Sequence, residues 1–137
     1  MNYLTQALYG TLTGGTALKN LLAGGTAGTA VYYQQAPKNA AYPYVVFNLQ
    51  GGGDINITPS RQKDYIYFVR GYSKFTPAYA GSIDAQIDAL LHGRTLTVTN
   101  WANFWTARTS DFENVETSPD QDNVYMAGGF YRIRLDS

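Results

Sequence analysis

The stretch from residue 62 to residue 73, QKDYIYFVRGYS, decides the expected fold of this chain. It is rich in aromatic and β-branched residues, which favour a strand. Side chains of a strand alternate between its two faces. The faces are Tyr65, Tyr67 and Val69 on one side, and Ile66, Phe68 and Arg70 on the other. Because both are largely apolar or aromatic, we expect a helix to cover one face and a partner or second layer to cover the other.

A helix is predicted directly after this strand. Thr76-Pro77 places a capping residue before a proline at the first helical position. Apolar residues then recur at helical spacing, and Gly93 is expected to cap the C-terminal end. The apolar stripe consists of Ala80, Ile83, Ile87, Leu90 and Leu91. This stripe predicts a long helix packed across one face of a sheet.

The N-terminal part carries shorter helical signals. Residues 3–12 show apolar side chains near helical spacing. Thr16 is expected to N-cap a second short helix, which Gly24-Gly25 ends. The small-residue stretch 24–30 is typical of a loop.

Several other segments predict strands. They are residues 31–34, 42–50, 96–98, 101–109 and 124–135, with Pro43 near the start of the second and a bulge expected at Gly128-Gly129 in the last. Strands that follow one another without a crossover helix should pair antiparallel. The sequence therefore predicts an α+β fold: an antiparallel sheet of four to five strands, with a long helix packed on one face and a short N-terminal helical segment.

Two segments are predicted as connections. Residues 51–60, GGGDINITPS, separate two strong strands by more than a hairpin needs, which indicates a projecting arm or a mobile loop at about 51–61. Residues 111–123 contain five acidic groups and Pro119, which indicates a solvated connection. Length predicts one domain over residues 1–137.

Composition excludes several classes of protein. Ten basic and ten acidic residues cancel, which argues against a module that coats DNA or RNA. The absence of cysteine excludes disulfides, thiol nucleophiles and Cys-ligated metals, and a lone histidine excludes multi-His metal sites. No stretch has the length of a membrane span or the pattern of a signal peptide, so a soluble cytoplasmic product is expected. Twelve tyrosines in a chain with 15% charged residues suit a β-rich fold, a protein interface, or both.

Residues with possible chemistry have simpler interpretations. His92, in the last helical turn, is read as a surface or capping residue rather than a catalytic one. Asp84 and Asp88 are read as a solvated polar face rather than an acid–base pair. The acidic stretch lacks the spacing of an EF-hand loop; its residues are Asp111, Glu113, Glu116, Asp120 and Asp122. We therefore predict no catalytic residues, no metal site and no cofactor.

Two further patterns also have simpler interpretations. Gly51-Gly52-Gly53 lacks the following Gly-Lys-Ser/Thr and the helix of a phosphate loop. Arg132 and Arg134 alternate with Ile133 and Leu135, which indicates the outer face of an edge strand. The alternative for the two arginines is salt bridges at an interface.

The stretch Val31 to Phe47, VYYQQAPKNAAYPYVVF, resembles the tail completion family of long-tailed bacteriophages, which includes tail terminator, or tail-to-head joining, proteins. Its features are a short strand, Ala-Pro, a small-residue spacer, and then aromatic-Pro-Tyr-Val-Val. The N-terminal helix, the helix at 83–91 and the Tyr-Arg-Ile-Arg pattern at 131–134 fit in the same order. The Gly/Thr/Ala-rich stretch 24–30 departs from the family, whose members often show an Arg-containing entry to the first strand.

The resemblance implies a structural virion protein without a substrate. Such a subunit forms a ring, typically a hexamer, at the head-proximal end of the tail tube, where it stops tube polymerisation and joins the head connector. The implied partners are copies of itself, the tail tube protein and a head completion or connector protein, with no membrane and no sequence-specific nucleic acid. It would assemble in the host cytoplasm and reside in the virion.

Contacts in such a ring are expected at the glycine-rich arm and its flanking strands. The candidate interaction residues are Gly51, Gly52, Gly53, Asp54, Ile55, Asn56, Ile57, Arg61, Tyr65 and Tyr67. Two alternatives remain open: another neck or adaptor protein, such as a head-closure protein of similar fold, and a small hydrolase or ligand-binding domain.

Overall fold

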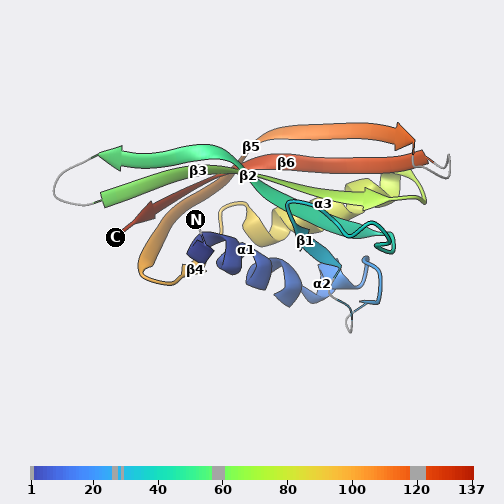
Figure 1. The fold of residues 1–137 in the computed structure, drawn as a ribbon, viewed down its shortest axis with the longest axis horizontal. Coiled ribbons are helices and arrows are strands. Elements are labelled where there is room, and N and C mark those ends of the chain that lie inside the picture. Colours follow the sequence, from blue (N-terminus) through green and yellow to red (C-terminus); the bar gives the residue numbers. More distant parts are fainter. Residues whose placement is uncertain (1, 26–27, 29, 57–60, 118–122) are drawn as a thin grey trace.

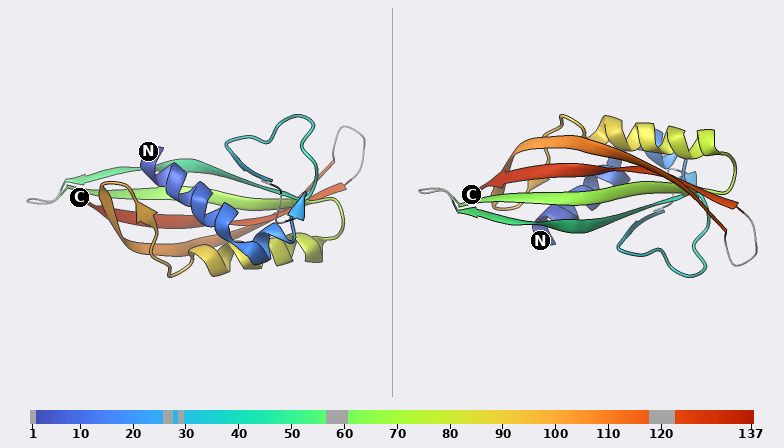
Figure 2. Two further views of the ribbon diagram at one scale, coloured as in Figure 1. Left: turned by 90° about the horizontal axis from the view of Figure 1, so that it is seen from below. Right: turned by 90° about the horizontal axis from the view of Figure 1, so that it is seen from above.

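A six-stranded sheet and three helices form two layers in the part of the chain that the structure, a computed structural model, describes (Figure 1). That part comprises residues 2–25, 28, 30–56, 61–117 and 123–137. The elements in chain order are α1 (Asn2–Gly14), α2 (Thr16–Lys19), β1 (Val31–Tyr33), β2 (Tyr44–Asn56), β3 (Arg61–Ser73), α3 (Pro77–Leu91), β4 (Thr97–Val98), β5 (Trp101–Thr117) and β6 (Asn123–Asp136). The helices all lie on the same side of the sheet (Figures 1 and 2). The α+β class is therefore confirmed.

The sheet has more strands than expected and is not wholly antiparallel. The strand order is β1-β2-β3-β6-β5-β4, and every neighbouring pair is antiparallel except β1 and β2, which run parallel. Because β1 and β2 run parallel, the ten residues between them must carry the chain back along the length of β1. They do so without a helix. The expected four to five antiparallel strands are therefore corrected to six with one parallel pair.

The helix α3 begins as its sequence predicts. The Thr76 Oγ1 accepts a hydrogen bond of 3.1 Å from the backbone N–H of Tyr79, and Pro77 follows the cap. Gly93 comes after the C-cap residue and has the positive φ of 69° that a helix stop favours. Gly71 on β3 leaves room for the side chain of Ile83, so the helix lies close against the sheet. The N-cap of α2 is Gly15 and not Thr16, without a side-chain hydrogen bond.

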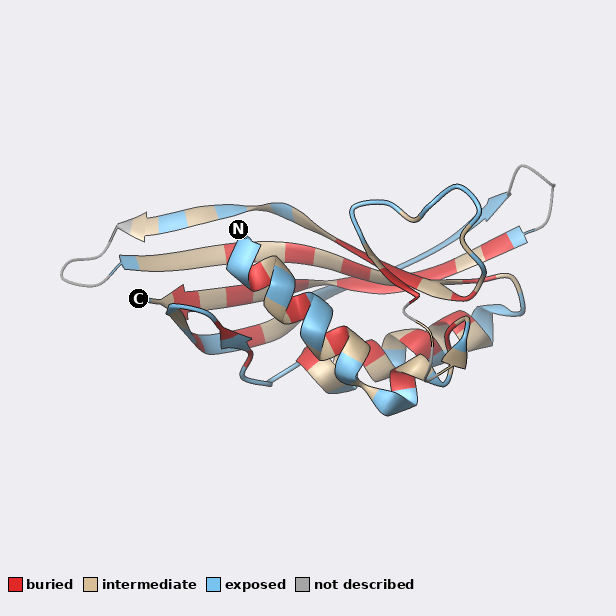
Figure 3. Cartoon of the chain, turned by 60° about the horizontal axis from the view of Figure 1, so that its bottom comes forward, coloured by how far each residue is buried: buried red, intermediate tan, exposed pale blue. Residues whose placement is uncertain are grey.

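The core lies between the helices and one face of the sheet (Figure 3). Its fully buried side chains include Leu4, Leu8 and Leu12 of α1, Ile83, Ile87 and Leu91 of α3, and Phe47, Tyr67, Val69, Tyr131 and Ile133 of the strands. The buried Tyr67 hydroxyl lies 3.0 Å from Thr5 Oγ1, which ties β3 to α1. Burial raises the pKa of Tyr67 to about 12, since the phenolate is poorly solvated there.

Two strand predictions need correction. Residues 111–117, predicted as a connection, continue β5 and pair with residues 123–129 of β6. The bulge lies on β5, between Arg108 and Ser110, and the β3–β6 register runs through Gly128 and Gly129 without a shift. These glycines instead permit close approach, because a Cβ on Gly129 would lie 2.5 Å from Arg108 Nε.

The predicted loop over residues 51–60 is also partly wrong. Gly51 to Asn56 continue β2 and pair with residues 61–66 of β3, after a register shift between Leu49 and Gly51. Gly52 has φ +114°, and a Cβ there would overlap the carbonyl oxygen of Asp64. Gly52 therefore permits the close β2–β3 pairing, whereas residues 57–60 lie outside the described residues. The projecting arm itself stays a prediction.

Candidate interaction surface

The face of the sheet opposite the helices is uncovered within the described chain and carries a group of aromatic side chains. Phe68 of β3 stacks on Phe130 of β6 with ring centroids 4.6 Å apart. Phe112 of β5 meets Phe68 edge-on at 5.6 Å and is 41% exposed. A contiguous aromatic patch of this kind on a monomer is typical of a protein interaction site. We call this the open face.

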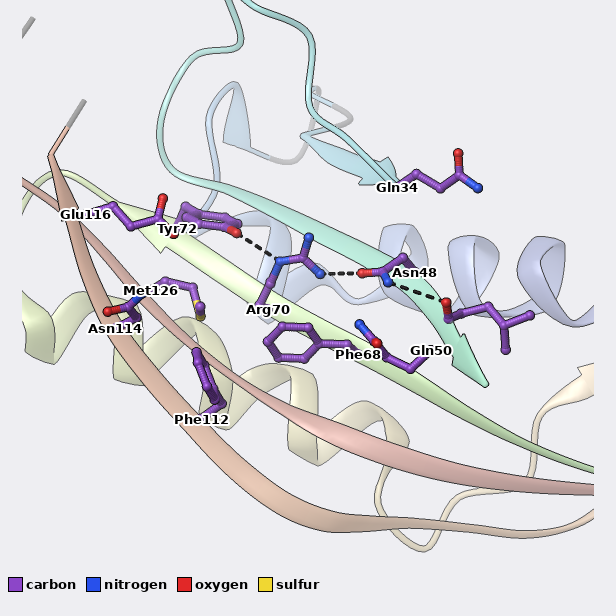
Figure 4. Close-up of a pocket in the computed structure, with 11 residues that line it drawn as sticks. Gln34, Asn48, Gln50, Phe68, Arg70, Tyr72, Phe112, Asn114, Glu116 and Met126 are labelled. Atoms are coloured by element: carbon purple, nitrogen blue, oxygen red, sulfur yellow. Dashed lines mark hydrogen bonds between the residues drawn. The ribbon is translucent and has the colours of Figure 1, made fainter. Parts of the chain in front are cut away.

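Arg70 lies at the centre of a hollow in the open face (Figure 4). Its guanidinium lies 4.7 Å from the Phe68 ring centroid and donates hydrogen bonds to the Tyr72 hydroxyl, at 2.8 Å, and to Asn48 Oδ1. No described carboxylate lies within ion-pair distance of it. The hollow has a volume of about 450 Å³ and is also lined by Gln34, Leu49, Gln50, Phe112, Asn114, Glu116 and Met126. A guanidinium with only neutral hydrogen-bond partners retains donors for an acidic group of another molecule.

The other end of the open face is a network of charges around Asp64. Arg132 donates two hydrogen bonds to the Asp64 carboxylate, at 2.9 and 2.6 Å, and Arg134 Nε lies 3.6 Å from it. The Arg134 guanidinium also lies 4.9 Å from the ring of Trp105. Because β6 lies between β3 and β5, the expectation that Arg132 and Arg134 line an edge strand is wrong. Both arginines lie in the middle of the sheet.

Arg108 joins β5 to α3. It donates two hydrogen bonds of 2.8 Å to Asp84, one of 2.5 Å to Asp111 and one of 2.8 Å to the carbonyl of Gly128. Burial by itself lowers the pKa of Arg108, but the hydrogen bonds to Asp84 and Asp111, together with the charges of Tyr131 and Asp84, outweigh it and raise the pKa above its ordinary value. The interpretation of Asp84 as a solvated polar residue is therefore wrong, because Arg108 holds it in a part-buried ion pair.

The single histidine also has a structural contact. His92 Nδ1 accepts a hydrogen bond of 3.0 Å from the backbone N–H of Arg108, so the ring links the end of α3 to β5. Asp88 lies beside the same cluster, 3.3 Å from the Tyr131 hydroxyl. In the described ranges no group of three or more His, Cys, Asp or Glu side chains could hold a metal ion. Asp120 and Asp122 of the acidic stretch lie outside those ranges.

The structure separates the predicted interaction residues into two groups. Gly51 to Asn56 lie on β2, where Asp54 binds Arg61 at 2.6 Å and Lys63 at 2.5 Å. The hydrogen bonds from Lys63 and Arg61 lower the pKa of Asp54. Tyr65 and Tyr67 instead point into the core, at 8% and 0% exposure, so neither can offer a side chain to a partner of the intact fold. Ile57 lies outside the described residues.

Several open-face residues were not among those predicted. Alternation along residues 124–135 could have placed Phe130 and Arg132 on one face, because they lie two apart in a strand. The sequence did not predict a strand position for Phe112, because its acidic neighbours indicated a loop. The pairing of β5 with β6 keeps those acidic residues in a strand.

No helix among the described residues is long and apolar enough to cross a membrane. The described chain thus presents helices on one face of its sheet and an aromatic patch on the other (Figure 1).

The comparisons identify the family. Residues 6–124 match the family of tail completion protein gp17, and the chain therefore belongs to that family. Its fold is similar to that of a chain in the virion of a native gene transfer agent (GTA) particle, with a TM-score of 0.78 at 18% identity. That match covers 99% of this chain and 96% of the other, and at this identity it speaks for the fold alone. A comparison with curated proteins finds no match. The family membership makes this chain a structural protein of a phage-type tail.

Proposed function

We propose that this protein caps the head-proximal end of the tail tube as a ring, with a hexamer as the expected number. The ring ends tube polymerisation and forms the joint to the head connector. The observation that carries the proposal is the open face, which the described chain leaves uncovered. It is combined with membership of the tail completion family. Burial of exposed aromatic groups is a general driving force for association.

The open face suits a neighbour in the virion better than a small substrate. Phe68, Phe112 and Phe130 offer rigid apolar area, and Arg70 offers a cation without a carboxylate partner among the described residues. Aromatic residues and arginine are the side chains most enriched where proteins bind one another. We assign this face to the contact with the tube or the connector.

The β2–β3 hairpin supports the same proposal as a contact arm. Its glycine run and its ion pairs among Asp54, Arg61 and Lys63 lie at one end of the sheet, away from the helices (Figure 1). A subunit that meets its neighbour through two different surfaces makes a head-to-tail contact, which closes into a ring when the rotation closes. The protein would assemble in the host cytoplasm and remain in the virion at the head–tail junction.

Electron microscopy of particles made without this protein tests the proposal. Tails of uncontrolled length, with few heads attached, are the expected result. Tails of normal length beside leaking full heads would contradict tail termination and favour the alternative, a head-closure protein of similar fold. Neither comparison separates the two roles: the family match gives tail completion as a class, and the likeness to the GTA virion chain speaks for the fold alone.

A point variant tests the assigned surface. Arg70→Glu reverses the charge in the hollow, and we expect purified variant to fold normally but to restore less than about a tenth of tail joining, since a like charge now faces the partner's acidic group. Lys38→Glu, a charge reversal in the exposed loop after β1, is the matched control and should restore joining in full. Equal activity of the two variants would remove the hollow from the proposed contact.

A further inference from the structure

Two stretches of strand have no neighbour on their outer side among the described residues. On β2, β1 pairs only with Val45 to Phe47, and the strand is open from Gln50 to Asn56. On β5, β4 pairs only with Trp101 and Ala102, while Thr106 and Arg108 bond to residues at the end of α3. The strand is then open from Ser110 to Thr117. Each open stretch begins at a register shift.

The sheet register shows which backbone groups point outward. Gly51 and Gly53 face residues of β3 whose backbone groups point toward β2, so the outward groups of β2 are those of Gly52 and Asp54. The same alternation on β5 gives Asp111, Glu113, Val115 and Thr117. Of these, the N–H of Val115 donates to its neighbour Asn114 Oδ1 at 2.9 Å, and that contact must open for another strand to pair. Unpaired rows of this kind are templates for strand addition.

The two open stretches are placed for head-to-tail pairing. They lie on opposite edges of the sheet and toward its opposite ends, as the two hairpins show in Figure 1. Three antiparallel steps separate β2 from β5, so the two strands run antiparallel. A second copy in the same orientation, shifted along the strands, would therefore bring its β5 beside this β2 as an antiparallel neighbour.

The glycines of β2 point to a close backbone neighbour. A Cβ on Gly51 or Gly53 would meet nothing within 4 Å, and neither has a positive φ, so the chain's own fold does not require glycine at these positions. Glycine weakens a strand interior and often marks the close approach of another backbone. Charge agrees with this arrangement. The open stretch of β5 carries Asp111, Glu113 and Glu116, whereas the β2–β3 hairpin carries two cations, Arg61 and Lys63, against the single carboxylate of Asp54.

We propose that the open stretch of β2, residues 50–56, pairs antiparallel with the open stretch of β5, residues 110–117, of the next copy. The sheets of neighbouring subunits would then be continuous around the assembly. This inference rests on the proposed ring, and it specifies which two edges meet.

Cysteine cross-linking tests the pairing, because the chain has no cysteine of its own. The backbone N–H and C=O of Gly53 point toward β3, and a side chain at this position would lie on the open face. Phe112, Asn114 and Glu116 of β5 lie on the same face. We would mix a Gly53→Cys variant with each of Phe112→Cys, Asn114→Cys and Glu116→Cys, one at a time, both in solution and in assembled particles. These three cover the registers in which the two open stretches overlap most. Gln6→Cys on the exposed side of α1 is the control.

The expected result is a disulfide between the two different variants in one of the three mixtures. Links of Gly53→Cys to itself would show a two-fold contact and overturn the pairing, as would absence of links in all three mixtures. The mass of the native assembly isolated from particles gives the number of copies and separates the two proposals. A closed ring without β2–β5 links overturns the edge pairing alone, whereas a single copy per particle overturns the ring and the pairing together.

Proline on the edge provides a second test. The N–H of Glu113 points outward and has no acceptor among the described residues, so Glu113→Pro removes a donor that the described fold does not use. We expect Glu113→Pro to fold and to lower cross-linking at least fivefold, while Glu113→Ala, which keeps the N–H, leaves it near the unsubstituted level. Unchanged cross-linking in a folded Glu113→Pro variant would contradict edge pairing.

Discussion

Arg108 on β5 and Asp84 on α3 form a two-point ion pair, in which both guanidinium Nη atoms lie 2.8 Å from the carboxylate oxygens. Their side chains are only 13% and 19% exposed. The pair is therefore shielded from water and fastens the middle of α3 to β5.

Loss of this pair should weaken the fold. Arg108→Gln leaves Asp84 and the carbonyl of Gly128 without a charged partner, and we expect a fall of about 2–3 kcal/mol in the free energy of unfolding. Urea denaturation measures it. Arg94→Gln removes an exposed arginine whose Nε donates to the Ala89 carbonyl, and it should cost less than about 1 kcal/mol. Equal losses in the two variants would show that the ion pair does not stabilise the fold.

Gly52 should be far less tolerant of a side chain than Gly53. Gly52→Ala puts a Cβ at φ +114° and against the Asp64 carbonyl, and we expect it to destabilise the protein by about 2 kcal/mol or more. Gly53→Ala, one residue away in open space, is the control and should be neutral within about 0.5 kcal/mol. Thermal unfolding of both variants checks this, and similar melting temperatures would contradict the bulge geometry at Leu49 and Gly51.

Alkaline pH should unfold the protein partly through Tyr67. Its pKa is raised to about 12 in the folded state from an ordinary value of 10, since burial disfavours the phenolate. Folding therefore favours the neutral form of Tyr67. This preference contributes about 2–3 kcal/mol to the free energy of unfolding; the contribution is complete below pH 10 and is lost as the pH rises toward 12.

The test is the pH dependence in a Tyr67→Phe variant. This variant loses the contact with Thr5, so we expect it to be slightly less stable at pH 8, yet to lose less stability between pH 9 and pH 11.5 than the unsubstituted protein. Denaturation at the two pH values gives the difference. The exposed Tyr3→Phe variant is the control, and the proposed coupling does not hold if Tyr67→Phe shows the same loss as that control.

The open face should matter for assembly more than for stability. Phe112→Ser removes a 41% exposed ring that contacts Phe68, and we expect a cost of no more than about 1 kcal/mol in unfolding but a loss of at least tenfold in tail joining. Joining of tails and heads in an extract gives the activity. Phe75→Ser, which removes a 62% exposed ring beside Tyr79, is the matched control. Full joining by Phe112→Ser would exclude Phe112 from the contact.

The local pattern of the sequence determined the main elements. Thr76-Pro77 with the stripe Ala80, Ile83 and Ile87 predicted α3, because capping and helical spacing act within a few residues. The alternation of Tyr65, Tyr67 and Val69 against Ile66 and Phe68 predicted both faces of β3. The family resemblance at residues 31–47 was likewise present in the sequence and is confirmed by the match over residues 6–124.

Only the tertiary structure decided which strands are neighbours and which surfaces remain free. The acidic residues of 111–117 indicate a loop until β6 pairs with them, and Arg132 and Arg134 indicate an edge until β5 lies beside them. Tyr67 belongs to the core because α1, some sixty residues earlier, covers it. Strand pairing joins residues far apart in the chain, whereas sequence patterns report only periodicity and local backbone preference, so the open face and its two free edges emerged from the fold.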